Sequence, residues 1–306
     1  MRKWAFLVCV LAAVVAASVV EAAAPRKFGF TCMTMNNPFF TTIEASVRKE
    51  VEKDGDILIT YDTKQDIATQ INQIEDMINQ GIELLFLCPV DSDGILPALD
   101  MLAEAKIPVI NFDTDVKDKN LVETVLVSNN EYAGFIVGQA LAKKFPNGGK
   151  IAILDAPYAE ACVIRVNGFN KGKGDKFPIV SQQNGKGDIG ESLPIAEAIL
   201  QANPDLAAFF CVNDPSALGA LSAVEGAGLR GKVAVYGVDG SPDAKKSIKE
   251  GGMAATGAQS PIGIGVECVK AAREIMAGGK VEKEIQVPTF LIDASNVDEY
   301  GIDGWQ

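Results

Sequence analysis

The sequence contains no histidine among its 306 residues. This absence excludes Ser-His-Asp and Cys-His catalytic sites, histidine-ligated metals and the commonest general base at neutral pH. The cysteines form no CxxC pair and no other metal-ligand spacing, so we predict no metal site. Acid–base chemistry would depend on carboxylates and lysines alone, which favours a binding protein over an enzyme.

The sequence is also poor in basic charge, because 28 Lys and Arg residues stand against 40 Asp and Glu residues and the net charge is −12. No stretch of the chain forms a basic stripe. An acidic chain repels nucleic acid and anionic lipid, so we predict neither as a partner.

Nucleotide-binding motifs are missing or incomplete. The phosphate-cradling loop GxxxxGK[ST] does not occur. Gly185, Gly187 and Gly190 match the spacing of the dinucleotide fingerprint between a predicted strand and a predicted helix. The acidic residue that should end the next strand is absent, however, so we predict no cofactor.

Only one long apolar run occurs, from Trp4 to Val20. Arg2 and Lys3 precede it and small residues at 22–24 follow it, which is typical of a cleaved secretory signal peptide. The run is short for a membrane span of about 20 residues, and no second such run exists. We therefore predict that residues 1–24 are removed on export. The mature protein, with 26 basic and 39 acidic side chains, would be located in the periplasm.

Five cysteines remain in the mature chain. Their number is odd and most lie in apolar segments, where they are interpreted as small buried side chains. Cys32 and Cys88 would end two neighbouring parallel strands of the sheet predicted below. A disulfide between these two residues is therefore left open.

Apolar strand-like segments alternate with helix-like segments along the rest of the chain. Ile67, Ile71, Ile74 and Ile78 have helical spacing, for example, and Gly81 ends that segment. Strands that are apolar throughout and separated by amphipathic helices indicate a parallel sheet covered on both faces. The pattern occurs twice, so we predict an α/β fold of two doubly wound, Rossmann-like lobes with parallel sheets. The predicted strands are 28–33, 57–61, 84–88, 108–112, 125–127, 151–154, 179–181, 207–212, 233–238 and 254–258, with an extended segment at 285–291.

Polar side chains follow the carboxyl ends of these strands, which is where open α/β sheets bind ligands. N-capping of the following helices explains part of the pattern, and we assign Asp62, Asp91, Asp93 and Asp214 to that role. The remaining groups suit a neutral polyhydroxyl ligand, because a carboxylate accepts a hydroxyl proton while an amide or guanidinium donates one. Phe rings offer flat apolar faces for the C–H side of a sugar. These remaining residues include Asn36, Asn37, Phe39, Phe40, Asp113, Thr114, Asp115, Asp155, Asn213, Asp239 and Gln259.

Several segments resemble the ribose-type periplasmic binding proteins of ABC importers, over essentially all of the mature chain. Each motif alone is weakly specific, whereas the set together is specific. The motifs are Asn36-Asn37-Pro38-Phe39-Phe40, Pro89-Val90-Asp91-Ser92-Asp93, Pro108-Val109-Ile110, Asn213-Asp214 with Ala217-Leu218-Gly219-Ala220, Gly237-Val238-Asp239-Gly240 with Pro242-Asp243, and Ala254-Ala255-Thr256 with Ala258-Gln259.

This resemblance implies the type I fold of periplasmic binding proteins, with lobes joined by a three-segment hinge. The expected boundaries are 25–128 and 260–288 for the N-terminal lobe, and 129–259 and 289–306 for the C-terminal lobe. Three short crossings permit hinge closure around a ligand. The implied function is that of a monomeric extracytoplasmic solute-binding protein, not an enzyme, which hands a monosaccharide or polyol to an ABC transporter permease. A chemoreceptor is left open as a further partner.

The resemblance also implies which residues contact the ligand. Ribose binders carry Arg directly after the aspartate that matches Asp113, whereas Thr114 stands here, and the loop at 185–188 lacks their aromatic residue. Glu160, in a loop that also differs from theirs, is added as an acidic side chain within reach of the pocket. A site with fewer cations disfavours ribose and favours another monosaccharide, a polyol or a ligand with a cationic group. The expected ligand-binding residues are Asn37, Phe39, Phe40, Asp113, Thr114, Glu160, Arg165, Asn213, Asp239 and Gln259.

Two other functions are left open by the sequence. A secreted glycosidase that uses only carboxylates needs two of them about 5–9 Å apart across one bond, and Asp113 and Asp239 would meet only when the lobes close. A binder of a non-sugar ligand such as a nucleoside would share the same fold.

Overall fold

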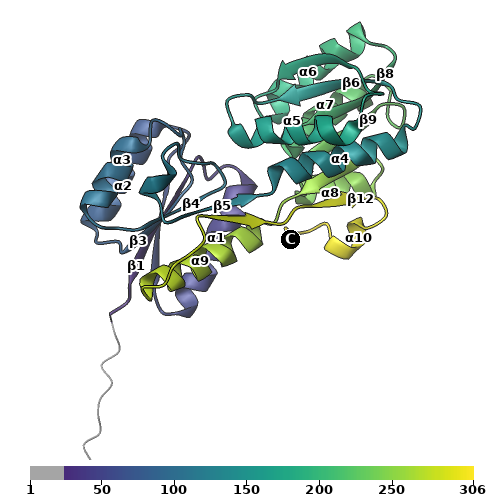
Figure 1. Ribbon diagram of the computed structural model, residues 1–306. Helices are drawn as coiled ribbons and strands as arrows, with labels where there is room; N and C mark the ends of the chain where they lie inside the picture. Colours follow the sequence, from purple (N-terminus) through teal and green to yellow (C-terminus); the bar gives the residue numbers. More distant parts are fainter. Residues whose placement is uncertain (1–23) are drawn as a thin grey trace, which may run out of the picture.

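The structure is a computed structural model that describes residues 24–306, so the predicted signal peptide at 1–24 lies outside the described residues except for Ala24. The described chain forms two α/β lobes (Figure 1). Every helix in this range is too short or too polar to cross a bilayer.

The first lobe is built on a six-stranded sheet with the strand order β11-β5-β4-β3-β1-β2, and every neighbouring pair is parallel. Helices α1 and α9 lie side by side on one face, and α2 and α3 cover the other (Figure 1). The elements are β1 (Lys27–Cys32), α1 (Pro38–Lys53), β2 (Ile57–Asp62), α2 (Ile67–Asn79), β3 (Leu84–Leu87), α3 (Leu96–Glu104), β4 (Val109–Phe112), the 3-10 turn η1 (Lys119–Leu121), β5 (Thr124–Ser128), α9 (Pro261–Met276) and β11 (Glu284–Val287).

The second lobe repeats this plan with the strand order β12-β10-β9-β8-β6-β7. Helices α4 and α5 cover one face of its sheet, and α6, α7 and α8 cover the other. The elements are α4 (Asn130–Lys144), β6 (Lys150–Asp155), α5 (Glu160–Lys173), β7 (Ile179–Asn184), α6 (Ile189–Ala202), β8 (Leu206–Cys211), α7 (Asp214–Gly226), β9 (Ala234–Asp239), α8 (Pro242–Lys249), β10 (Ala255–Ala258), β12 (Phe290–Asp293) and α10 (Val297–Tyr300).

One strand departs from the predicted parallel sheets, because β12 is antiparallel to β10. The connectivity explains the difference. Strand β10 runs toward the other lobe, and the chain then forms α9 and β11 there before it returns through β12. A strand that enters the sheet from the side of the first lobe runs opposite to β10. A parallel arrangement would need a crossover helix in the second lobe between the two strands, and the chain has none there.

The chain crosses between the lobes at three places, at residues 128–130, 258–261 and 287–290. Two of these crossings are joined by hydrogen bonds: Thr289 Oγ1 donates to the Asn129 carbonyl oxygen at 3.1 Å, and Asn129 N donates to the Val287 oxygen at 3.1 Å. The predicted fold of two doubly wound lobes with a three-segment hinge is confirmed, while the exact lobe boundaries stay a prediction.

Each sheet carries a hydrophobic core on both of its faces. Phe30 and Phe112 stack at 5.2 Å in the first lobe, and Phe169 and Phe210 stack at 3.9 Å in the second. Burying one such ring contributes about 1.5–3 kcal/mol to folding. Each lobe therefore has hydrophobic cores of its own.

Helices α4 and α5 approach each other closely enough for their backbones to touch. A Cβ atom at Gly134 would lie 2.0 Å from the Arg165 carbonyl oxygen, and a Cβ at Gly168 would lie 1.9 Å from that of Glu131. Only glycine fits at these contacts. This packing therefore fixes the position of α5 relative to α4, and with it the position of Arg165.

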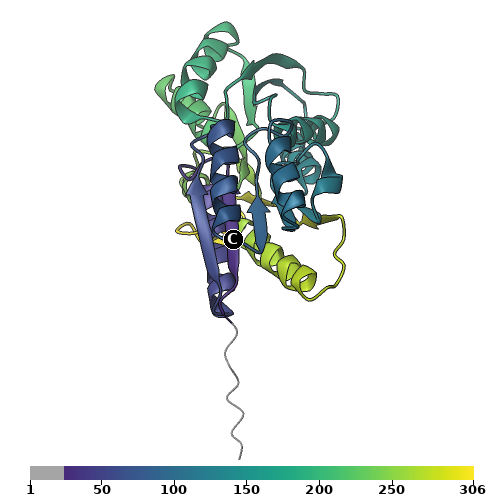
Figure 2. The ribbon, with the colours of Figure 1, turned by 90° about the vertical axis from the view of Figure 1, so that its left-hand side faces the viewer.

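The last residues of the sequence do not lie at the far end of the second lobe. Figures 1 and 2, which differ by a quarter turn, both place residue 306 near the middle of the molecule, where the lobes meet. Trp305 packs against the core of the first lobe, whereas Ile302 packs against the core of the second.

The five cysteines of the described chain are all free and buried. The Cys32 thiol lies 3.5 Å from the Thr34 oxygen, and the Cys88 thiol lies 3.9 Å from Asp113 Oδ2. The disulfide left open by the sequence is therefore absent from the structure.

Candidate functional site

A cleft of about 190 Å³ opens between the two lobes. Nine of the ten residues predicted to contact a ligand line it, and Glu160 is the exception. The residues that line the cleft are Met33, Thr34, Asn37, Phe39, Phe40, Gln65, Asp113 and Thr114 from the first lobe, and Ala156, Tyr158, Ala159, Ala161, Cys162, Arg165, Lys186, Gly187, Asn213, Asp239 and Gln259 from the second.

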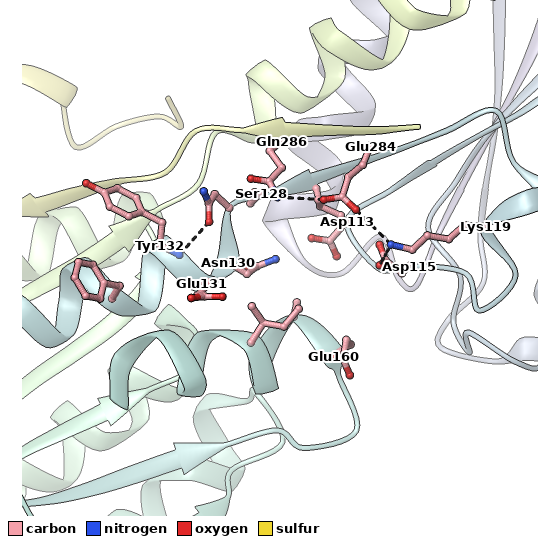
Figure 3. A pocket seen from close by; sticks show the side chains of 15 residues that line it. Asp113, Asp115, Lys119, Ser128, Asn130, Glu131, Tyr132, Glu160, Glu284 and Gln286 are labelled. Atoms are coloured by element: carbon pink, nitrogen blue, oxygen red, sulfur yellow. Dashed lines mark hydrogen bonds and ion pairs between the residues drawn. The ribbon is translucent and has the colours of Figure 1, made fainter. Parts of the chain in front are cut away.

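Glu160 is exposed and lines a neighbouring cavity of about 700 Å³, which we call the hinge-side cavity. Asp113 and Ala161 line both spaces, so the cleft and the hinge-side cavity adjoin. In Figure 3, acidic side chains of the first lobe face those of the second across this cavity. Its charged residues are Asp113, Asp115, Lys119 and Glu284 from the first lobe and Glu131 and Glu160 from the second.

The two aspartates that line the cleft both occupy unusual backbone conformations. Asp113 follows β4 with φ +63°, and Asp239 ends β9 with φ +138°, next to Gly240 at φ +76°. Residues other than glycine rarely adopt such φ angles, and each residue held in this way costs of order 1–3 kcal/mol of backbone strain. Strain of this kind is concentrated at functional sites, and here it turns two carboxylates into the space between the lobes.

Asp239 is the centre of a buried hydrogen-bond network. Gln259 Nε2 donates to Asp239 Oδ1 at 2.7 Å, and Arg165 Nη1 lies 3.4 Å from the same oxygen. The other oxygen accepts a hydrogen bond from Asp214 N at 3.3 Å. Gln259 Oε1 is buried without a partner in the described chain. It is an acceptor, and a ligand hydroxyl would satisfy it.

Arg165 is almost completely buried and joins three parts of the second lobe. Its Nε donates to Asn130 Oδ1 at 2.8 Å, and its Nη1 donates to the Val212 oxygen at 2.9 Å. Since these hydrogen bonds use only Nε and Nη1, the Nη2 group can donate to a ligand in the cleft that Arg165 lines.

The carboxylates around Arg165 have raised pKa values. Burial is the largest cause for Asp113 and Asp239, and the Arg165 charge opposes it in both. The pKa of Asp214 is raised by burial first and by the Asp239 charge second, although Ser241 N and Thr256 Oγ1 each donate to its oxygens at 2.7 Å. Two of these acidic groups, Asp113 and Asp239, therefore share one buried cation, Arg165.

Two of the predicted ligand residues also cap helices. Asn37 Oδ1 accepts from Phe39 N at 2.9 Å at the start of α1, and Asn213 Oδ1 accepts from Ser216 N at 3.0 Å at the start of α7. Asn213 Nδ2 in addition donates to the Gly187 oxygen. Asn213 thus holds the shape of the cleft wall with both ends of its amide.

The capping roles predicted for four aspartates are wrong. Helix α2 is capped by Asp66, α3 has no side-chain cap, and α7 is capped by Asn213. Asp62 instead accepts from Met35 N at 3.0 Å and so positions the loop after β1. Asp91 folds back on the amides of residues 93 and 94. Turn formation competes with capping for the same side-chain chemistry.

Phe39 and Phe40 belong to the first turn of α1 and contact each other edge to face at 5.5 Å. Both are largely buried in the core of the first lobe while lining the cleft. Phe39 makes a second edge-to-face contact at 5.9 Å with Trp305. The sequence contained no signal for this contact, because the two residues are 266 positions apart and no motif includes residue 305.

The sequence reasoning also missed Tyr158 and Lys186, which belong to two loops of the second lobe. Tyr158 Oη donates to the Lys186 carbonyl oxygen at 2.8 Å, so the two loops are joined at the edge of the cleft. Both loops depart from the ribose-binder pattern, and that departure was the available signal.

The cleft offers hydrogen-bonding groups without an activated nucleophile. Burial raises the pKa of Cys32 to about 12 and that of Cys162 to about 11, so both thiols are neutral at pH 7. Within residues 24–306, no group of three His, Cys, Asp or Glu side chains is placed to hold a metal ion. The arrangement suits recognition of a small polar molecule.

Comparison with known proteins agrees with this geometry. A family model described as a periplasmic binding protein domain matches residues 28–280. The ribose import binding protein RbsB of Bacillus subtilis is 36% identical over 86% of this chain and 86% of its own length. The RbsB of Escherichia coli is 34% identical over 95% of this chain and 98% of its length.

Solved structures of binding proteins are also similar to this chain. The binding protein of the arabinose ABC transporter from Shewanella sp. ANA-3, bound to L-arabinofuranose, superposes with a TM-score of 0.84 at 28% identity and covers 89% of this chain and 93% of its own. A Caulobacter myo-inositol binding protein bound to myo-inositol superposes with a TM-score of 0.82 at 27% identity, over 90% of this chain and 97% of its own.

Proposed function

The chain belongs to the periplasmic binding protein family, and from this premise we propose that it binds one monosaccharide or polyol between its lobes for delivery to an ABC importer. The observation that carries the proposal is the convergence of nine polar and aromatic residues from both lobes on one cleft. The relatives are binding proteins of importers, and the protein is not an enzyme.

The chemistry of the cleft supports a neutral polyhydroxyl ligand. A sugar hydroxyl donates and accepts at once, so it can donate to Asp239 or to the free Gln259 Oε1 while it accepts from Arg165. Phe39 and Phe40, which line the cleft, would contact the apolar face of the ring. Relatives named for ribose and allose, and structures that hold arabinofuranose and inositol, all bind ligands of this class.

Thr114 supports a ligand other than ribose. It stands where ribose binders carry Arg, and its Oγ1 lies 3.3 Å from Asp113 Oδ2, within the first lobe. The shorter side chain leaves a donor missing and additional room beside Asp113. We therefore favour a hexose or a cyclic polyol over a pentose, and a ligand with an amino group as the second candidate, because the adjoining hinge-side cavity is acidic.

Contacts from both lobes provide the mechanism. A ligand that touches Asp113 on one lobe and Asp239 on the other stabilises the closed arrangement over the open one, and the population shifts by its differential affinity for the two. The permease would then read closure. We place this cycle in the periplasm, with the protein as a monomer and a chemoreceptor as an additional reader of the closed state.

A thermal-shift screen of the protein without residues 1–24 tests the ligand proposal. The panel contains D-ribose, D-allose, L-arabinose, myo-inositol, glucosamine and adenosine. Ligand at about 1,000 times its Kd adds about 4 kcal/mol, so the binder should raise Tm by several degrees. The protein is first unfolded and refolded to remove any co-purified ligand, and the extract is identified by mass spectrometry. Failure of every sugar and polyol, together with an empty extract, would contradict the proposal.

A further inference from the structure

The segment 301–306 follows the last helix and touches both lobes and the hinge. Trp305 packs on the core of the first lobe, and Gln306 contacts the second lobe and the 258–261 crossing. This segment is a fourth link between the lobes, in addition to the three chain crossings. None of its residues lines the cleft itself.

Gln306 supports the main chain of the two cleft residues that form the Asp239 network. Its Nε2 donates to the Gln259 carbonyl oxygen at 2.5 Å and lies 3.4 Å from that of Asp239. Gly240 has φ +76°, and a Cβ there would come within 2.6 Å of both this nitrogen and the Ala258 Cβ, so glycine is favoured at this position. Gln306 therefore holds the strained Asp239-Gly240 turn from behind.

Partly buried hydrogen bonds hold the segment in place. Lys245 is fully buried in α8, and its Nζ donates to the Gly304 oxygen at 2.6 Å and to Gln306 Oε1 at 3.1 Å. Ser260 Oγ, within the second crossing, donates to the Gln306 main-chain oxygen at 2.9 Å. A buried ammonium with carbonyl partners of this kind is costly to leave unsatisfied. The segment is thus part of the folded second lobe and hinge.

Trp305 extends from this anchored segment to the opposite lobe. Its ring meets Phe39 edge to face at 5.9 Å, with 68° between the ring planes, and Phe39 in turn meets Phe40 at 5.5 Å. Phe39 is in the first turn of α1, and its ring has two aromatic neighbours, Phe40 and Trp305. Trp305 is the one of these two neighbours that comes from the segment 301–306.

We propose that Trp305 and Gln306 are positioning residues of the ligand site, which hold Phe39 from one lobe and the Asp239-Gln259 pair from the other in binding geometry. The inference rests on the proposed function, because it concerns the same cleft. The site predicted from the sequence did not include this feature, in which one short segment supports both walls of the cleft.

Trp305 itself provides the first test. The sequence has two tryptophans, Trp4 and Trp305, so Trp305 is the only one in the protein without residues 1–24. Its fluorescence should change in intensity or wavelength as the cognate sugar is titrated, with the same Kd as calorimetry gives. An unchanged emission spectrum at saturating ligand would overturn the inference.

Substitution gives the second test. An edge-to-face aromatic contact is worth enough to shift an equilibrium by roughly 3- to 10-fold, so Trp305→Ala should weaken Kd by that factor and Trp305→Phe should restore most of it. Gln306→Ala, which acts on the other wall, should weaken Kd similarly. Phe145→Ala is the matched control, since Phe145 is a half-buried aromatic of the second lobe outside the cleft. It should lower Tm without changing Kd.

The outcomes separate this inference from the function on which it rests. Wild-type Kd in both Trp305→Ala and Gln306→Ala would overturn the positioning role and leave the proposed function intact. A wild-type protein that binds no sugar or polyol would contradict both. If Trp305→Ala does not fold, the comparison of Trp305→Phe and Gln306→Ala with the Phe145→Ala control decides in the same way.

Discussion

At the scale of single residues, Arg165 does two tasks with one side chain. It ties α5 to Asn130 and to the Val212 oxygen, and it faces the carboxylate of Asp239. The first task needs the planar fork of the guanidinium, whereas the second needs only positive charge. A lysine could perform the second task and not the first.

Arg165→Lys should therefore weaken ligand binding by about 10- to 100-fold, because hydrogen bonds to a charged group contribute about 1.5–3 kcal/mol each. The free energy of unfolding should fall by about 1–3 kcal/mol at the same time. Calorimetric titration and urea denaturation measure the two effects. Arg230→Lys, at a half-exposed arginine outside the cleft, is the control. Unchanged affinity in Arg165→Lys would remove this residue from the binding site.

Asp214 determines a pH dependence of folding. Its pKa is higher in the folded protein than in the unfolded chain, chiefly because it is buried. The folded state therefore holds more protons, and stability must fall as the pH rises above the ordinary aspartate value of about 4. The loss is complete only above the raised pKa.

Asp214→Asn should make this loss smaller. The amide oxygen can still accept from Ser241 N, and the amide nitrogen can face Thr256 Oγ1, so both contacts survive. We expect the ligand-free variant to be destabilised less than wild type between pH 5 and pH 8, as measured by urea denaturation across that range. Asp100→Asn, on an exposed face of α3, controls for the net charge. An equal slope in all three proteins would show that Asp214 does not titrate in this way.

At the scale of elements, the alternation of apolar strands and amphipathic helices was enough to predict both lobes. The direction of β12 was not predictable, because it depends on the chain leaving for the other lobe and returning, which no local pattern encodes. The prediction of helix caps failed for a similar reason. Asp62 and Asp66 have the same side-chain chemistry, and only the tertiary position of the loop after β1 decides which of them caps α2.

The candidate site was predictable where a motif carried it, and unpredictable where geometry alone did. Six residues of the motifs line the cleft, and the other three predicted residues found there, Asp113, Thr114 and Arg165, were implied by the resemblance outside the motifs. Trp305 and Gln306 lie in no motif and reach the cleft residues only through tertiary packing. Whether these residues contact a ligand stays a prediction for binding experiments.

The contact between α4 and α5 gives a prediction at the same scale. Gly168→Ala would place a Cβ against the Glu131 oxygen and push the helices apart, so it should destabilise the protein by roughly 2–4 kcal/mol and weaken binding through Arg165. Gly226→Ala, in α7 with open space around it, should be neutral or stabilise by about 0.5–1 kcal/mol. Thermal unfolding and calorimetry measure both. Equal effects of the two substitutions would contradict the close-packing argument.

At the scale of the whole molecule, the charges that line the hinge-side cavity oppose closure of the lobes. On the first lobe, Asp115 and Glu284 are balanced only by Lys119, which pairs with Asp115 at 2.6 Å and with Glu284 at 3.4 Å, while Asp113 is influenced by Arg165 of the second lobe. On the second lobe Glu131 pairs with Lys171, and Glu160 has no ion-pair partner in the described chain. Both faces of the cavity are therefore net negative (Figure 3). Closing the lobes brings like charges together.

This repulsion predicts that a neutral sugar binds more tightly as salt is added. The Debye length falls from about 30 Å at 0.01 M to about 8 Å at 0.15 M ionic strength, so salt screens the repulsion between the lobes and lowers the cost of closing. Because unit charges about 4 Å apart in water interact by about 1 kcal/mol, we expect Kd to improve by roughly two- to fivefold over this range. Glu160→Gln should bind more tightly than wild type at low salt and show a weaker salt dependence, whereas Glu197→Gln, on an exposed face of α6, should behave as wild type. Small-angle scattering at each salt concentration would show whether the closed population changes in parallel. Binding that weakens with salt would mean that the ligand is itself a cation, which the acidic hinge-side cavity attracts, and would select the amino-substituted ligand over the neutral one.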